Sequence, residues 1–245
     1  MPEESFAFRM RGREVSRVEA FSDVVFGFAL TLIVVSLEVP TEFAELIKMM
    51  RGFPGFAICF AMLTWLWHVH HTFFRRYALT DEITITLNTV LLFLVLFYTY
   101  PLKFIFSIMT GQIRAGGADA AKLFIIYGLG FAGIFVVYVL MYVHAYRKRE
   151  ELGLNEFELH DTKTAMIMYS SHVAIGVLSA VLGATLEGSA LNFAGWTYFL
   201  LGPASGGIGY WRGSQRHKLQ VEYAQTMPNS RQTEATASVA AVGPM

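Results

Sequence analysis

Six long apolar segments constrain this chain more than any other feature of its sequence. They cover residues 18–39, 53–74, 84–107, 123–145, 164–186 and 191–211. Each is about long enough for a helix to cross the ~30 Å hydrocarbon core of a bilayer. The segments are continuously apolar, whereas strands of a transmembrane β-barrel alternate, and a soluble bundle would need polar stripes that residues 91–97 lack. The sequence therefore predicts an all-α integral membrane protein with six transmembrane helices per subunit.

The distribution of lysine and arginine predicts the orientation. If both termini lie on one side of the membrane, that side receives fourteen of the nineteen lysines and arginines. Because basic residues concentrate in cytoplasmic loops, we expect both termini in the cytoplasm of a multi-pass cell-membrane protein. The first sixteen residues are charged and no small-residue cleavage site follows, so the first segment is expected to stay as a signal anchor.

The organisation along the chain is simple. Residues 1–16 form a cytoplasmic N-terminal segment, residues 17–215 the six-helix domain, and residues 216–245 a cytoplasmic tail. The tail is expected to be disordered, because from about residue 224 it is too polar to bury a core. The internal loops are too short for a separate catalytic domain. A net charge of zero gives no sign of a nucleic-acid partner.

The first apolar segment carries charged residues only near its ends. Asp23 lies at its start and Glu38 at its outer end. Ten apolar residues favour insertion by about 0.3–0.6 kcal/mol each, whereas one aspartate at the helix centre costs about 2.5–3.5 kcal/mol. The helix therefore inserts because its charges are peripheral, and Arg17, Ser22 and Asp23 are available to bind neighbouring helices.

Histidines raise the alternative of a metal or haem site. His68 and His71 share one helix face, but two imidazoles make an incomplete metal site. His144 and His172 cannot be placed beside them from sequence. A polar network that joins these histidines to Ser22, Asp23 and Asn88 is the preferred interpretation, without metal or cofactor. A redox protein with haem held by His68, His71, His144 or His172 is the less favoured alternative.

Several functional motifs are absent from the sequence. No segment has arginine at every third position, as in a voltage sensor, and no potassium-filter sequence of the TVGYG type occurs. No phosphate-binding loop, nucleophile elbow or zinc-protease motif is present. The sequence therefore gives no basis for an enzyme.

One group of motifs resembles a known family. Arg17-x-x-x-Phe21-Ser22-Asp23, the Trp65-x-x-His68 to His71 cluster and Leu87-Asn88 look like the prokaryotic members of the transmembrane protein 175 family of potassium channels. The resemblance covers about residues 10–215. It implies a homotetramer in the lipid bilayer, with the first helix of each subunit lining a central pore that prefers potassium over other monovalent cations.

The resemblance also implies roles for individual residues. The motif residues would act in packing and assembly; they are Arg17, Phe21, Ser22, Asp23, Trp65, His68, His71 and Asn88. The pore lining and its hydrophobic constriction would be Phe28, Thr31, Leu32 and Val35. Phe28 departs from the family, which has a bulky aliphatic residue there, and four phenylalanines at one level could close the path by filling or dewetting it. The alternative for these positions is an ordinary helix–helix seam.

Glu38 continues the same stripe toward the outer end of the first helix. In a tetramer, four such carboxylates would attract cations to the pore mouth. The alternative is a glutamate that reaches the membrane interface without a role in conduction. An alternative hypothesis for the function of the protein is that it is a proton conductor or a transporter, because histidines in a membrane can relay protons.

Overall fold

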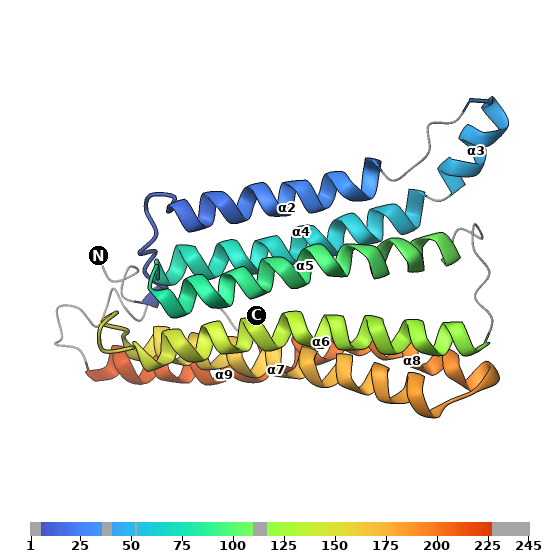
Figure 1. Ribbon diagram of the computed structural model, residues 1–245. Coiled ribbons are helices and arrows are strands. Elements are labelled where there is room, and N and C mark those ends of the chain that lie inside the picture. The colour runs from blue at the N-terminus through green and yellow to red at the C-terminus, as the bar shows by residue number, and fades with distance from the viewer. Residues whose placement is uncertain (1–5, 36–40, 52, 110–116, 227–245) are drawn as a thin grey trace.

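The computed structural model describes residues 6–35, 41–51, 53–109 and 117–226, and every regular element within these ranges is helical. Among these residues, the six long helices α2, α4, α5, α6, α7 and α9 form a bundle (Figure 1). The elements are α2 (Arg17–Val35), α3 (Phe43–Arg51), α4 (Phe53–Tyr77), α5 (Glu82–Met109), α6 (Gly117–Arg147), α7 (Glu156–Thr185), the 3₁₀ helix η1 (Gly188–Leu191), α8 (Asn192–Trp196), the 3₁₀ helix η2 (Thr197–Leu200) and α9 (Leu201–Thr226).

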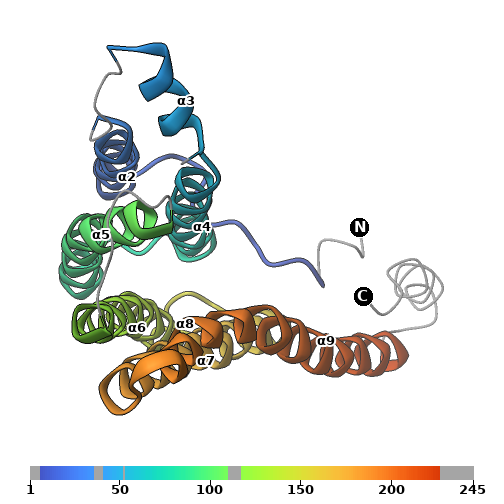
Figure 2. The ribbon, with the colours of Figure 1, turned by 90° about the vertical axis from the view of Figure 1, so that its right-hand side faces the viewer.

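Helix α2 lies at the edge of the bundle. It packs on α4 and α5, and on the other side α6 packs on α5 and α7. Figure 2 looks nearly along the bundle and shows α2 on the side opposite α7 and α9. One face of α2 is therefore covered by the subunit's own helices, and the other face points away from them.

Four helices in the described part of the chain are long and apolar enough to cross a membrane. They are Phe53–Tyr77, Glu82–Leu102, Asp119–Arg147 and Glu156–Thr185. The first predicted segment, 18–39, coincides with α2 up to Val35, and its remaining residues lie outside the described ranges. The last predicted segment, 191–211, is divided among the end of η1, α8, η2 and the start of α9.

Helices α6 and α7 approach each other closely because glycines face one another. A Cβ atom on Gly128 would lie 2.6 Å from the Gly176 carbonyl oxygen, and one on Gly176 would lie 2.9 Å from the Gly128 carbonyl oxygen. Small residues permit such backbone contact between helices in a membrane. The pair fixes the position of α7 against the rest of the bundle.

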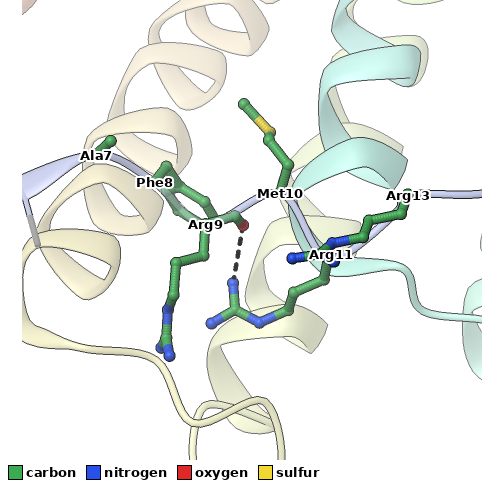
Figure 3. Close-up of a pocket in the computed structure, with 6 residues that line it drawn as sticks. All are labelled: Ala7, Phe8, Arg9, Met10, Arg11 and Arg13. Carbon is green, nitrogen blue, oxygen red and sulfur yellow. Dashed lines mark hydrogen bonds between the residues drawn. The ribbon is translucent and has the colours of Figure 1, made fainter. Parts of the chain in front are cut away.

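Residues 6–16, which we call the strap, cross the end of the bundle before α2 begins. The Gly12 N–H donates to the Arg75 carbonyl at 3.1 Å, and Arg75 Nη1 donates back to the Gly12 carbonyl at 3.0 Å. Figure 3 shows the arginines of the strap extending from this segment. The strap thereby connects α2 to the end of α4.

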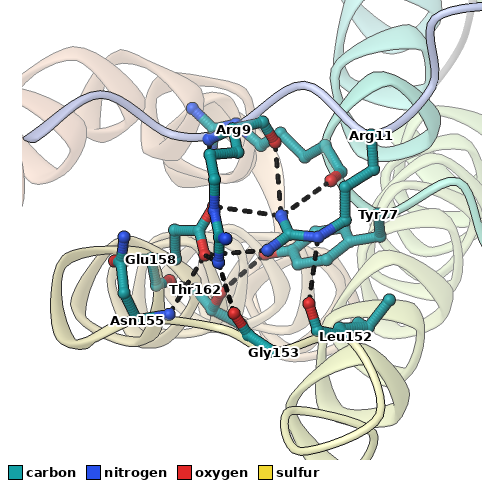
Figure 4. Close-up of polar contacts among 9 residues, drawn as sticks. Arg9, Arg11, Tyr77, Leu152, Gly153, Asn155, Glu158 and Thr162 are labelled. Carbon is teal, nitrogen blue, oxygen red and sulfur yellow. Dashed lines mark hydrogen bonds and ion pairs between the residues drawn. The ribbon is translucent and has the colours of Figure 1, made fainter. Parts of the chain in front are cut away.

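Glu158 of α7 anchors the strap (Figure 4). Its carboxylate is fully buried and pairs with Arg9 Nη2 at 2.9 Å and Arg11 Nη2 at 2.8 Å. The same residue closes a capping box with Asn155 at the start of α7. Because charge-assisted bonds to a buried carboxylate are strong, this contact holds the strap against α7.

Helix α9 continues through Thr226, so residues 216–226, assigned to the tail from sequence, form its last turns. Tertiary contacts explain the difference. Arg216 Nη2 donates to the Phe6 carbonyl at 2.6 Å, and Arg216 Nε lies 2.9 Å from Asp161 Oδ1. Gln220 is buried. These contacts with the strap and α7 stabilise the last turns of α9. Residues 227–245 lie outside the described residues.

Candidate functional site

Helix α2 has a buried face and an exposed face. Phe26, Ala29 and Ile33 are at most 3% exposed and pack into the core. On the opposite side, Phe21 and Phe28 are 63% and 61% exposed. Residues three, four and seven positions apart share a helix face, so Phe21, Val24, Phe28 and Thr31 form one continuous stripe, which we call the outer stripe of α2.

The residues expected to line a pore lie on or beside this stripe. Thr31 is exposed and its Oγ1 donates to the Phe28 carbonyl at 2.8 Å, which leaves a hydroxyl oxygen free to accept. Leu32 is half-buried at the edge of the stripe. Val35 ends α2, but its side chain and all of Glu38 lie outside the described residues.

Beneath the outer stripe, a buried hydrogen-bond network joins α2, α4 and α5. Asn88 Nδ2 donates to Ser22 Oγ at 2.9 Å, and Ser22 Oγ donates to the Val18 carbonyl at 2.7 Å. Asn88 Oδ1 accepts from His70 Nε2 at 2.8 Å. Because an amide oxygen only accepts, His70 carries its proton on Nε2 in this network. His70, Ser22 and Asn88 are all at most 2% exposed.

Asp23 makes a second contact between α2 and α4. Trp67 Nε1 donates to Asp23 Oδ1 at 2.7 Å. Arg17, six residues before Asp23, is exposed and forms no ion pair with any described residue. The carboxylate is therefore held by an indole within the subunit, and the guanidinium of Arg17 and the ring of Phe21 point outward.

The other motif residues occupy three different environments. Trp65 packs in the core, with its ring centroid 5.3 Å from Phe135 and 5.5 Å from His172. His68 is exposed. His71 Nδ1 lies 3.4 Å from Glu19 Oε1, and its ring stacks on Trp67. The structure thus joins Ser22 to Asn88, binds the neighbouring Asp23 to Trp67 instead, and places Trp65, His68 and His71 outside these hydrogen bonds.

Sequence reasoning missed His70 and Trp67, although a signal for both was present. Leu63, Leu66, Phe73 and Phe74 are buried, and His70 lies three or four positions from three of them. Position 70 therefore falls on the buried stripe of α4 by helical periodicity. Position 67 falls beside that stripe, on the side that meets α2.

The histidines do not converge on a metal site. Among the described residues, no group of three or more His, Cys, Asp or Glu side chains could hold a metal ion. His144 Nε2 lies 2.9 Å from Asp81 Oδ2, and His172 Nδ1 bonds to the Met168 carbonyl at 2.7 Å. These two imidazoles therefore bond to different partners.

Asp81 lies in the connection between α4 and α5 and is the centre of a charged cluster. It accepts the Thr84 N–H at 2.9 Å and pairs with Lys148 Nζ at 3.1 Å in addition to His144. Burial raises the pKa of the Asp81 carboxyl, but the bonds from His144, Thr84 and Lys148 lower it more, so that this pKa lies below its usual range. The cluster ties the start of α5 to the end of α6.

Comparisons with known proteins connect this geometry to a family. Residues 17–98, which contain α2, α4 and most of α5, match the family Endosomal/lysosomal potassium channel TMEM175. A potassium channel of Marivirga tractuosa is 38% identical over 216 residues, which cover 80% of this chain and 87% of that protein. A potassium channel of Chamaesiphon minutus is 30% identical over 127 residues, 48% of this chain and 63% of that protein.

The fold is also similar to a solved structure. The crystal structure of a variant of the potassium channel MtTMEM175, in complex with a Nanobody-MBP fusion protein, superimposes with a TM-score of 0.71 at 35% sequence identity. The match covers 82% of this chain and 95% of that chain. Sequence and fold therefore agree over most of the described helices.

Proposed function

Because the chain belongs to the TMEM175 family of potassium channels, we propose that the outer stripe of α2 lines its ion path and that Phe28 forms the narrowest part. The chain is a multi-pass membrane protein of a channel family, and this family does not consist of enzymes. The resemblance inferred from the motifs of α2, α4 and α5 is thus confirmed at the level of the family.

The exposed outer stripe is the observation that carries the proposal. A fully apolar exposed face would fit lipid, but this stripe ends in the exposed Thr31, which carries a hydroxyl group. The opposite face of α2 is fixed by Asn88, His70 and Trp67. Because these contacts fix the buried face of α2, the helix can present Phe28 and Thr31 at a defined position, as an ion path requires.

Four copies of α2 complete the proposed path. One helix cannot enclose an aqueous pathway, so several subunits must contribute the same face around a symmetry axis. We infer a homotetramer, in which four Phe28 rings lie at one level and Thr31, Leu32 and Val35 continue the wall. A ring of phenyl groups closes a pore by excluding water from it. A rotamer change of Phe28 would allow water to enter the constriction again. Other monovalent cations would pass the same wall with a lower preference.

The buried network has a structural role in this proposal. Ser22, Asn88 and His70 fix the rotation of α2, and Asp23 with Trp67 fixes its height on α4. Arg17 and Phe21 face outward, where a neighbouring subunit would contact them. These residues then support assembly and do not touch the ion.

The proposed topology has six crossings, and α4 to α7 would supply four of them as long apolar helices. Helix α2 would supply the first crossing, and the segment from η1 to the first half of α9 the last. The strap and the end of α9 would lie in the cytoplasm beneath the cell membrane, in keeping with the bias of lysine and arginine. At the other end, Glu38 would attract cations to the mouth.

Potassium flux through liposomes tests the proposal. Purified protein should carry a potassium current that reverses near the potassium equilibrium potential in opposed potassium and sodium gradients. A proton conductor would instead reverse with the pH gradient, and a transporter would show saturation without single-channel events. Absence of any monovalent current from assembled protein would contradict the proposed path.

A further inference from the structure

A cavity of about 640 Å³ lies beside the strap (Figure 3). Its walls are formed by Ala7, Phe8, Arg9, Met10, Arg11 and Arg13, so that three arginines and no acidic residue line it. The volume lies in the range of sites that bind small ligands. We propose that this cavity binds the phosphate group of an anionic lipid of the cytoplasmic leaflet. The proposal rests on the cytoplasmic placement of the strap and does not depend on how ions are conducted.

Two of the three arginines that line the cavity have N–H donors without a partner among the described residues. Each guanidinium nitrogen of Arg11 already has a partner, because its Nε donates to the Leu152 carbonyl at 3.1 Å and its two Nη atoms bond to Glu158. Arg9 uses Nε and Nη2 for Glu158 and Gly153, but its Nη1 has no bond to any described residue. The Arg13 side chain is exposed and has no described partner either. Arg9 and Arg13 can therefore both donate to a ligand.

The local charge favours an anion. Glu158 is a single carboxylate shared by Arg9 and Arg11, so one positive charge of this group remains uncompensated. Arg13 adds another positive charge to the lining, and the adjacent Glu14 is not among the lining residues. The Arg9 side chain is 54% exposed whereas that of Glu158 is fully buried, so a ligand approaching from outside meets guanidinium first. Guanidinium groups bind phosphate oxygens in pairs of parallel hydrogen bonds.

The surroundings favour a lipid over a soluble phosphate. Met10, between Arg9 and Arg11, is 48% exposed, and Val15, two residues after Arg13, is 67% exposed. The chain enters helix α2 at Arg17, only four residues after Arg13. Clusters of basic residues directly before a membrane helix attract anionic headgroups. Exposed apolar side chains in the same segment would contact the glycerol and upper acyl region, which a soluble phosphate does not offer.

Lipid titration of the protein in a nonionic detergent tests the proposal, with native mass spectrometry as the readout. Dioleoylphosphatidylglycerol should bind to each subunit more tightly than dioleoylphosphatidylcholine. In the double variant Arg9→Gln/Arg13→Gln its affinity should fall by roughly 30-fold, because each basic residue contributes on the order of 1 kcal/mol. The matched control Arg147→Gln/Arg149→Gln removes two charges from the end of α6 and should change the affinity less than threefold.

The single variant Arg13→Gln separates a loss of lipid binding from a loss of folding, because it leaves both ion pairs of Glu158 intact. It should weaken phosphatidylglycerol binding about fivefold. Equal binding of the two lipids, an unchanged affinity in Arg13→Gln, or an equal loss in the control double variant would each overturn the proposal. Displacement of phosphatidylglycerol from the wild-type protein by millimolar inorganic phosphate would overturn the choice of a lipid ligand.

Discussion

Trp67 of α4 donates its indole N–H to the Asp23 carboxylate of α2 across 2.7 Å. The second bridge between α2 and the bundle starts from the preceding residue, because Ser22 accepts a hydrogen bond from Asn88. Asp23 is half-buried, so the bond replaces part of the hydration that the carboxylate loses. The charged residue at the start of the first apolar segment is thus a contact between helices within one subunit.

The first prediction concerns this bond. Trp67→Phe keeps an aromatic ring but removes the donor, and hydrogen bonds to charged groups contribute about 1.5–3 kcal/mol. We expect a lower midpoint of thermal unfolding in detergent and less assembled protein on size-exclusion chromatography. Trp211→Phe is the control, because Trp211 is 53% exposed on α9. In a double-mutant cycle, Asp23→Asn should cost less in the Trp67→Phe background than alone; strict additivity would contradict the bond.

Phe28→Ala should increase potassium conductance. Replacing four phenyl rings by methyl groups widens and rewets a constriction at that level, so we expect at least a severalfold larger single-channel current. Phe97→Ala is a matched control, because Phe97 is 59% exposed but lies on α5. Equal currents in wild type and Phe28→Ala, with intact assembly, would place the constriction elsewhere.

Glu38→Gln should lower potassium conductance most strongly at low ionic strength. Carboxylates at a pore mouth concentrate cations there, and screening weakens this effect once the Debye length falls to about 3 Å at 1 M salt. Single-channel recordings at low and high potassium chloride check the prediction. Glu42→Gln serves as the control, and a reduction that is the same at both concentrations would argue against electrostatic attraction.

Gly176→Ala should destabilise the protein by roughly 1–3 kcal/mol, because overpacking forces the neighbouring backbone to move. The new Cβ would lie 2.9 Å from the Gly128 carbonyl oxygen and 3.0 Å from the Ala132 nitrogen. Gly209→Ala is the control, since no atom lies within 4 Å of its Cβ position, and alanine is the better helix former. Thermal melts should show a lower midpoint for the first variant and an unchanged or higher one for the second.

The Asp81 cluster predicts a dependence of stability on pH. Since the folded-state pKa of this carboxyl is lowered, the charged form stabilises the fold above the unfolded-state pKa of about 3.9 and this contribution is lost as the pH falls below it. Asp81→Asn should therefore be less stable than wild type at pH 7, and the difference should shrink below about pH 4. Glu150→Gln, at an exposed side chain, is the control; a difference that is constant with pH would exclude Asp81 as its source.

The sequence predicts those features of the structure that depend on residues close together in the chain, and it does not predict contacts between residues far apart in the chain. Helix positions follow from local hydrophobicity, so the predicted segments at 53–74 and 123–145 lie within α4 and α6. The family follows from short motifs and is confirmed by the comparisons. Glu158 could not be paired with Arg9 or Arg11, because nearly 150 residues separate them and hydrophobic periodicity carries no information on the partner of a charged side chain. The helical turns at 216–226 depend on contacts of the same long range.

The orientation of the Asn88 amide has a mechanical consequence. Its nitrogen faces Ser22 and its oxygen faces His70. Turning α2 about its own axis would break the bond to Ser22 in a region where water is scarce, because the bond to His70 on α4 keeps the Asn88 amide from following. Swivelling of α2 by itself is therefore disfavoured. Any widening of the central pathway should move α2, α4 and α5 together as one rigid block, with bending confined to the connections on either side of them.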